Sequence, residues 1–226
     1  MRPDGLPAAV LWDLDGTIVD TEPIWIAAEF DLAERHGATW TDADAERLIG
    51  HDLLESGQFI KERMALDLEP EEIVEDLVAA VLRHLASGDL EWRPGALELL
   101  AALRSSGVLL GLVTMSYRSI VDRLLPHLPE DVFDVVMTGD EVSAGKPDPE
   151  PYLAAARALG VDPRDCVAVE DSPTGARSAQ AAGCHVLAVP HHVPVGAEDN
   201  RTVRTSLVGL TPQDLGHLLR IEGPRA

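Results

Sequence analysis

The stretch that decides the fold is Val10-Leu11-Trp12-Asp13-Leu14-Asp15-Gly16-Thr17, near the start of the chain. Three apolar residues run directly into two acidic residues that are spaced two apart. Side chains alternate along a strand, so a buried strand that ends in this way presents Asp13 and Asp15 on the same side. Gly16 lets the backbone turn sharply and approach whatever the carboxylates bind. Two like charges this close need a cation, a shared proton or a partner, which indicates metal-assisted chemistry.

The composition is that of an ordinary globular protein. The chain has 226 residues, 46% of them hydrophobic, enough for one large domain or a core with a smaller insert. A formal net charge of −21 argues against nucleic acid or an anionic membrane as a partner. No apolar run approaches the roughly 18 residues of a membrane span, and residues 1–8 lack a signal-peptide core. Cys166 and Cys184 form no metal-binding or redox motif. We therefore expect a cytoplasmic monomer that acts on a small molecule.

Strand and helix patterns alternate along most of the chain. Short apolar segments rich in Val or Leu predict buried strands at 8–12, 108–113, 132–137, 166–169 and 185–189. Helical segments with clear end signals separate them, and the stretch 190–205 is polar and loop-like. This alternation predicts an α/β fold, a doubly wound, Rossmann-like parallel sheet with helices on both faces.

One region interrupts the alternation. Between the first strand and Trp92 we find no strand pattern, only helical patterns at about 22–36, 42–49, 53–64 and 70–85. The last of these carries apolar residues at helical spacing, which is typical of packing in a bundle. We predict a Rossmann-like core of residues 1–18 and 93–226, with an α-helical cap of residues 19–92 inserted over the carboxyl ends of the strands.

Polar residues also follow the later strands. The second strand leads into Thr114-Met115-Ser116, where a hydroxyl and backbone amides at a helix N-terminus suit a phosphate or another oxyanion. Lys146, one of only two lysines, follows the third strand, and Glu170-Asp171 ends the fourth. Each has a plain structural explanation when taken alone. Together they predict a reactive site at one edge of the sheet, with oxygen ligands of the kind that Mg²⁺ prefers.

The order of these motifs resembles the haloacid dehalogenase superfamily of aspartate-dependent phosphotransferases. The resemblance covers the chain from about Ala8 to Pro190 and rests on Asp13-Leu14-Asp15-Gly16-Thr17, Thr114, Lys146-Pro147 and Glu170-Asp171-Ser172. The helical insert is similar to that family's cap of the first type. Asp20-Thr21-Glu22-Pro23 resembles the branch that contains small sugar-phosphate phosphatases and beta-phosphoglucomutase.

The resemblance implies a Mg²⁺-dependent phosphatase that hydrolyses a small phosphate monoester, such as a sugar phosphate, through an aspartyl phosphate. Asp13 would be the nucleophile and Asp15 the general acid and base. The metal would be bound by Asp13, Asp15 (through its backbone carbonyl) and Asp171, with Glu170 nearby. The phosphate would be bound by Thr114, Met115, Ser116, Lys146 and the nearby backbone amides.

Two other branches of the superfamily fit less well. The dehalogenases lack the second aspartate of the first motif, which is present here as Asp15. The phosphonate-cleaving enzymes use a cap lysine, whereas Lys61 lies among charged residues and is expected to be a solvated charge. A catalytically inactive phosphate-binding protein remains a further alternative, although the four charged motif residues that it would be expected to lose are intact.

A phosphosugar mutase of the beta-phosphoglucomutase type is the alternative closest to this chain. Those mutases place an arginine and a histidine in the cap where this sequence has Leu53 and Trp25. The absence of both favours transfer to water, although Arg47 is near enough in sequence to substitute. His51 is a candidate for contact with a substrate.

Overall fold

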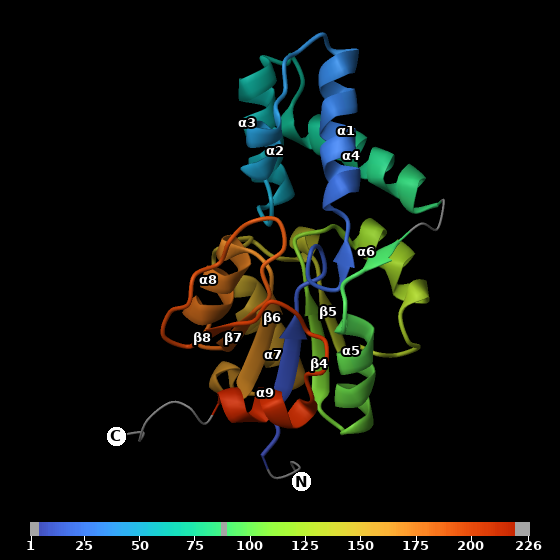
Figure 1. Ribbon diagram of the computed structural model, residues 1–226. Helices are drawn as coiled ribbons and strands as arrows, with labels where there is room; N and C mark the ends of the chain where they lie inside the picture. Colours follow the sequence, from blue (N-terminus) through green and yellow to red (C-terminus); the bar gives the residue numbers. More distant parts are fainter. Residues whose placement is uncertain (1–4, 87–89, 220–226) are drawn as a thin grey trace.

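A six-stranded sheet forms the base of the molecule, and a helical insert stands over one end of it (Figure 1). The computed structural model describes residues 5–86 and 90–219. The sheet has the order β5-β4-β1-β6-β7-β8, and every neighbouring pair is parallel. The predicted doubly wound α/β fold is therefore confirmed. The strands are β1 (Ala9–Trp12), β4 (Leu109–Val113), β5 (Val135–Met137), β6 (Cys166–Glu170), β7 (His185–Ala188) and β8 (Arg201–Val203).

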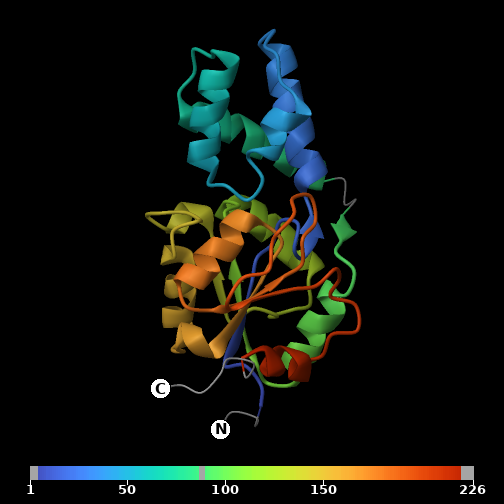
Figure 2. The same ribbon diagram turned by 60° about the vertical axis from the view of Figure 1, so that its left-hand side comes forward.

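Helices cover both faces of the sheet (Figure 2). The side chains of β1 are all buried and alternate between the two faces. Val10 and Trp12 pack with α5 (Ala96–Ser105), α6 (Arg118–Leu124) and α9 (Pro212–Leu218). Ala9 and Leu11 pack with α7 (Glu150–Leu159) and α8 (Pro173–Ala181). Burial on both faces explains why the strand sequences are almost continuously apolar.

The insert consists of α1 (Glu22–Arg35), α2 (Asp42–Glu46), α3 (Leu53–Met64) and α4 (Pro70–Leu85). The Asp52 side chain begins α3 by accepting hydrogen bonds from the N–H groups of Leu54 and Glu55, at 2.8 and 3.2 Å. The apolar stripe of α4 packs against α1 and α3, and α4 also contacts α6 of the core. Insert and core therefore share one continuous hydrophobic cluster.

A two-stranded antiparallel pair joins the insert to the core. β2 (Val19–Asp20) pairs with β3 (Glu91–Trp92), and the Arg93 N–H donates to the carbonyl of Ile18 at 2.9 Å. The sequence analysis did not predict this pair, because strands of two residues have no measurable periodicity. The predicted division between core and cap falls at this pair and stays a prediction.

The prediction of a loop over 190–205 was wrong at residues 201–203, which form the edge strand β8. The strand is three residues long and its side chains are partly polar, so no apolar run marks it. The Val186 N–H donates to the carbonyl of Asn200 and the Arg204 N–H to that of Ala188, both at 2.8 Å. Both cysteines are buried, and neither forms a disulfide. Within residues 5–86 and 90–219, no helix has the length and apolar character needed to cross a membrane.

Candidate active site

The register of the sheet brings three strand ends together beneath the insert. Trp12, the last residue of β1, lies beside Leu112 of β4 and Val169 of β6. The Asp13 N–H donates to the carbonyl of Val169 at 3.0 Å, which continues the sheet by one residue. Asp13, Thr114 and Glu170 therefore emerge at the same edge, as the sequence predicted.

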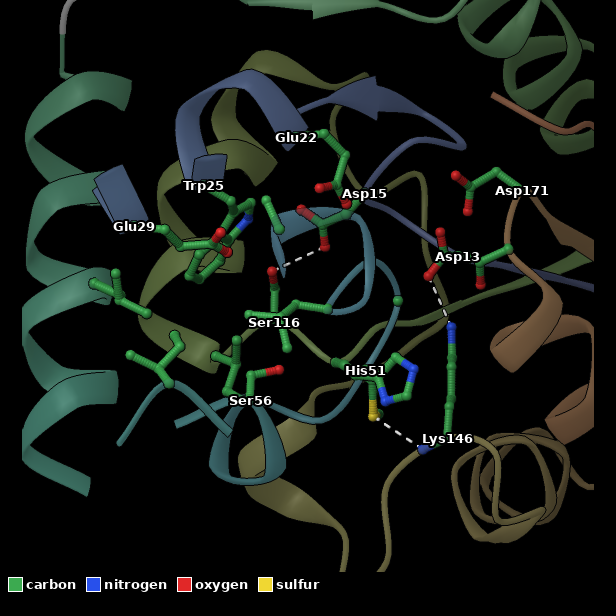
Figure 3. Close-up of a pocket in the computed structure, with 18 residues that line it drawn as sticks. Asp13, Asp15, Glu22, Trp25, Glu29, His51, Ser56, Ser116, Lys146 and Asp171 are labelled. Carbon is green, nitrogen blue, oxygen red and sulfur yellow. Dashed lines mark hydrogen bonds and ion pairs between the residues drawn. The ribbon is translucent and has the colours of Figure 1, made fainter. Parts of the chain in front are cut away.

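Lys146 joins two of the acidic residues. Its Nζ donates to Asp13 Oδ1 at 2.7 Å (Figure 3). It also donates to Glu170 Oε1 at 2.7 Å and to the carbonyl of Val113 at 3.0 Å. Its exposed fraction is only 2%. An ammonium group has three protons, so protein oxygens engage the full donor capacity of Lys146. The lysine thus fixes the position of Asp13, and its predicted direct contact with phosphate stays a prediction.

The buried charges at this edge do not balance. Burial raises the pKa of Asp13 to about 7, although the Lys146 ammonium opposes this. Burial and the nearby Asp13 carboxylate also raise the pKa of Asp171 well above its ordinary value. Burial alone would lower the pKa of Lys146, but the charges of Asp13 and Glu170 raise it instead. These directions agree, because one ammonium faces three carboxyl groups and the cluster favours an additional positive charge.

The acidic cluster fits a Mg²⁺ ion. Ligand atoms of Asp13, Glu170 and Asp171 lie within 4.8 Å of one another, and all are carboxylate oxygens. Within the described residues, the buried Asp13 Oδ2 has no hydrogen-bond partner. A Cβ at Gly16, where φ is +81°, would lie 2.2 Å from Asp171 Oδ2, and one at Gly175 would lie 2.0 Å from Glu170 Oε1. Glycine at both positions thus leaves room for these carboxylates.

The side chain of Asp15 is held apart from that cluster by three hydroxyl groups. Thr21 donates to its Oδ1, while Thr114 and Ser116 donate to its Oδ2 at 3.0 and 2.8 Å. The N-cap of α6 is Tyr117, and the hydroxyl of the preceding Ser116 is bound to Asp15. Of the predicted metal ligands, Asp15 is therefore the one whose carboxylate does not join the acidic cluster.

Two backbone amides beside Asp13 are available to an oxyanion. The N–H groups of Asp15 and Met115 donate to no protein acceptor within the described part of the chain. The Ser116 N–H instead donates to the Thr114 hydroxyl oxygen at 3.0 Å. The sulfur of Met115 accepts a hydrogen bond from the Lys146 backbone N–H at 3.1 Å, which connects the turn after β4 to the segment that carries Lys146. The backbone amides of Asp15 and Met115 are therefore available to a phosphoryl group, whereas the hydroxyls of Thr114 and Ser116 donate to Asp15.

A pocket lies between this edge and the insert (Figure 3). The core contributes Asp13, Asp15, Lys146 and Asp171, and the insert contributes a largely apolar wall. Members of that wall are Trp25, Ala45, Leu48, Leu53, Ile60 and Leu77. The insert also brings His51 and Ser56, together with two carboxyl groups, Glu22 and Glu29.

Sequence reasoning missed Glu22 and Glu29 as site residues. They lie seven residues apart on α1, so both project from the same helix face. Burial is the largest cause that raises the pKa of Glu22 to about 8, and it raises that of Glu29 to about 7. The sequence did contain one signal for them, because they are two acidic residues on an otherwise apolar helix face.

The structure also places the residues on which the mutase and the phosphonate-cleaving alternatives depended. Trp25, Leu53 and His51 line the pocket. Arg47 does not line it, since its guanidinium lies over the Phe59 ring at 4.4 Å from the centroid. Lys61 forms a salt bridge of 3.1 Å with Glu69, away from the pocket.

Comparisons with known proteins agree with this geometry. The family model described as haloacid dehalogenase-like hydrolase matches residues 10–189. Hexitol phosphatase B of Escherichia coli (strain K12) is 31% identical over 223 residues, which cover 92% of this chain and 96% of that protein. The bifunctional riboflavin kinase/FMN phosphatase of Arabidopsis thaliana is 31% identical over 190 residues, 82% of this chain but only 49% of that longer protein. The crystal structure of CbbY from Rhodobacter sphaeroides in complex with phosphate has a TM-score of 0.80 and 27% identity, and the match covers 90% of this chain and 96% of that one.

Proposed function

The chain belongs to the haloacid dehalogenase-like hydrolase family and is a phosphoric monoester hydrolase, and we propose that it uses Mg²⁺ to hydrolyse a sugar phosphate or a similar small metabolite. The observation that carries the proposal is the state of Asp13. One of its carboxylate oxygens is held by Lys146, the other is buried and without a hydrogen bond from the described residues, and the carboxyl group belongs to the acidic cluster. That second oxygen is available to a metal ion or to phosphorus.

The chemistry divides into two displacements at phosphorus. In the first, Asp13 attacks the phosphoryl group, the ester P–O bond breaks, and Asp15 gives a proton to the leaving oxygen. In the second, Asp15 takes a proton from water, which attacks the aspartyl phosphate and releases inorganic phosphate. Three hydroxyl donors hold the Asp15 carboxylate in one orientation, which suits a group that must face the leaving oxygen and then the water.

Charge stabilisation comes from the surroundings of Asp13. The free N–H groups of Asp15 and Met115 would donate to the phosphoryl oxygens. Asp13, Asp171 and the Asp15 backbone carbonyl would hold Mg²⁺, with Glu170 beside them. When bound, the ion offsets the negative charge of the carboxylates and of the phosphate. Lys146 holds Asp13 in place throughout.

The pocket favours water over a sugar hydroxyl as the final acceptor. A mutase must hold a second phosphate at a distance from Asp13, which requires a cationic group. Among the described residues, the insert wall contributes no lysine or arginine to the pocket, and Arg47 lies over Phe59 instead. We also propose a cytoplasmic monomer, with the core and cap divided at 18/19 and 92/93.

A turnover screen tests this function. Wild-type protein, Asp13→Asn and the surface control Glu34→Gln would be incubated with a panel of phosphate monoesters and Mg²⁺. We expect equimolar inorganic phosphate from the wild type and the control, and none from Asp13→Asn. Turnover by Asp13→Asn at the wild-type rate would rule out Asp13 as the nucleophile.

A further inference from the structure

The pocket has two ends of different character. At the core end, Asp13 lies beside the Lys146 ammonium and the free backbone amides. At the insert end, the polar groups include the carboxyls of Glu22 and Glu29, and no lysine or arginine accompanies them within the described lining. A phosphate is therefore accommodated at the core end only. The remainder of the substrate must extend toward the acidic groups of α1.

Glu29 is a fixed and half-satisfied acceptor at the insert end. The Trp40 indole N–H donates to its Oε2 at 3.0 Å, and Trp40 in turn packs edge-on against Phe59, with the ring centroids 5.9 Å apart. Glu29 is 5% exposed. Its Oε1 accepts no hydrogen bond from the described residues, although it borders the pocket. A buried carboxylate oxygen is stabilised when a donor reaches it, so this atom is suited to bind a ligand group.

The position of Glu29 along α1 places it far from the reacting phosphorus. Glu22, at the start of the helix, is close enough to the catalytic carboxylates that the charges of Asp15 and Asp13 contribute to its raised pKa. Glu29 follows two helical turns later, an axial rise of about 10 Å. No charge of Asp13 or Asp15 contributes to the raised pKa of Glu29. Glu29 therefore faces the far end of a bound substrate rather than its phosphate.

We propose that Glu29 determines substrate specificity by binding a hydrogen-bond donor, a hydroxyl or an ammonium group, at the end of the substrate opposite the phosphate. This inference rests on the proposed phosphatase function, since the phosphate must bind at Asp13 for the far end to reach Glu29. A second phosphate or a carboxylate at that end would meet Glu29 and a largely apolar wall, with no lysine or arginine of the described lining to pair with it. Esters with a distal donor are preferred, and those with a distal anion are excluded.

A matched set of esters tests the assignment. Hexyl phosphate, hydroxyhexyl phosphate and aminohexyl phosphate, each with its substituent on the carbon farthest from the phosphate, differ only in the distal group. Hexanediyl bisphosphate adds a distal anion. The kcat and KM of each would be measured for wild-type protein, Glu29→Gln and Glu29→Ala. Glu34→Gln, which changes an exposed carboxylate on the same helix, is the control.

In the wild type and in the control, we expect the two donor-bearing esters to have a KM about tenfold or more below that of hexyl phosphate. Glu29→Ala should remove this advantage, so that the KM values of the three hexyl esters become similar. Glu29→Gln keeps a hydrogen-bond acceptor without the charge, so it should retain the preference for the hydroxyl ester and lose that for the ammonium ester. Trp40→Phe, which removes the donor that orients Glu29, should weaken both preferences.

Three results would overturn the inference. One is equal KM values for the three hexyl esters in the wild type. Another is a decrease of kcat/KM in Glu29→Ala that is as large for hexyl phosphate as for the donor-bearing esters. The third is turnover of the bisphosphate as efficient as that of the hydroxyl ester. If folded wild-type protein hydrolyses none of these esters but releases phosphate from a member of the monoester panel, the inference fails and the phosphatase function stands; if it hydrolyses neither, the phosphatase function itself fails.

Discussion

Replacing Glu29 by glutamine should change how the stability of the protein depends on pH. Burial raises the pKa of Glu29 from an ordinary value of 4.5 to about 7 in the folded protein. Between these values the folded chain keeps a proton that the unfolded chain releases, so the free energy of unfolding falls as the pH rises. This pKa difference of about 2.5 units, at about 1.36 kcal/mol per unit, lowers the free energy of unfolding by about 3 kcal/mol by pH 8. Glutamine does not titrate and can still accept the hydrogen bond from Trp40.

Urea unfolding at pH 5 and pH 8 would measure the effect. Relative to wild type, Glu29→Gln should gain about 2.5 kcal/mol of unfolding free energy between these two pH values, because the remainder of the effect lies below pH 5. Burial, the largest cause of the raised pKa of Glu22, is present in both proteins, and only the smaller contribution of the Glu29 charge to that pKa is lost in the variant. Glu34→Gln, on the exposed side of the same helix, should show no such pH-dependent gain.

A constant difference between Glu29→Gln and wild type at the two pH values would refute this reasoning. It would mean that the Glu29 carboxyl is ionised in the folded protein as readily as in the unfolded chain. The insert end of the pocket would then be well hydrated, and a donor on the substrate would gain little by reaching Glu29. The stability measurement thus tests burial of this group without any assay of turnover.

Four further outcomes follow from the site. Asp13→Asn should abolish turnover while the protein stays folded by circular dichroism, because an amide is not a nucleophile toward phosphorus; retained turnover would contradict the covalent mechanism. Lys146→Met leaves Asp13 and Glu170 buried without their cation, and it should lower the free energy of unfolding by about 3–5 kcal/mol in urea titrations; a loss below about 1 kcal/mol would show that the lysine is not holding these groups. Turnover should disappear in excess chelator and return with added Mg²⁺, and glucose 1-phosphate, if it is a substrate, should yield free phosphate in step with its loss rather than its 6-phosphate isomer.

The fold and the centre of the site were predictable because both depend on local sequence. Each buried strand is an apolar run, and the polar residues that end β1, β4 and β6 meet at one edge whenever the strands are parallel. The sequence therefore predicted that Asp13, Thr114, Lys146 and Glu170 lie together. It also predicted the four helices of the insert, whose end signals lie close to the observed boundaries.

Details that depend on three-dimensional orientation were not predictable. The Lys146 ammonium and the Ser116 hydroxyl both lie in the predicted site, but their donors are directed at carboxylates rather than toward the space for phosphate. Glu22 and Glu29 were overlooked because acidic residues on a helix ordinarily face solvent, and only the packing of α1 over the core turns these two inward. Such orientations follow from tertiary packing and leave no periodic signal in the chain.

The contacts of the loop after β7 were not predictable either, and they connect the β2–β3 pair to the site. The Nε2 atoms of His191 and His192 lie 2.8 and 3.1 Å from the two Asp20 carboxylate oxygens, and Arg93 Nη1 lies 3.2 Å from His191 Nε2. Asp20 is in β2, next to Thr21, whose hydroxyl binds Asp15. The strands that join insert and core, the loop after β7 and the Asp15 carboxylate therefore form one chain of polar contacts. Asp20 and Thr21 thereby anchor the start of the insert both to the loop after β7 and to the Asp15 carboxylate.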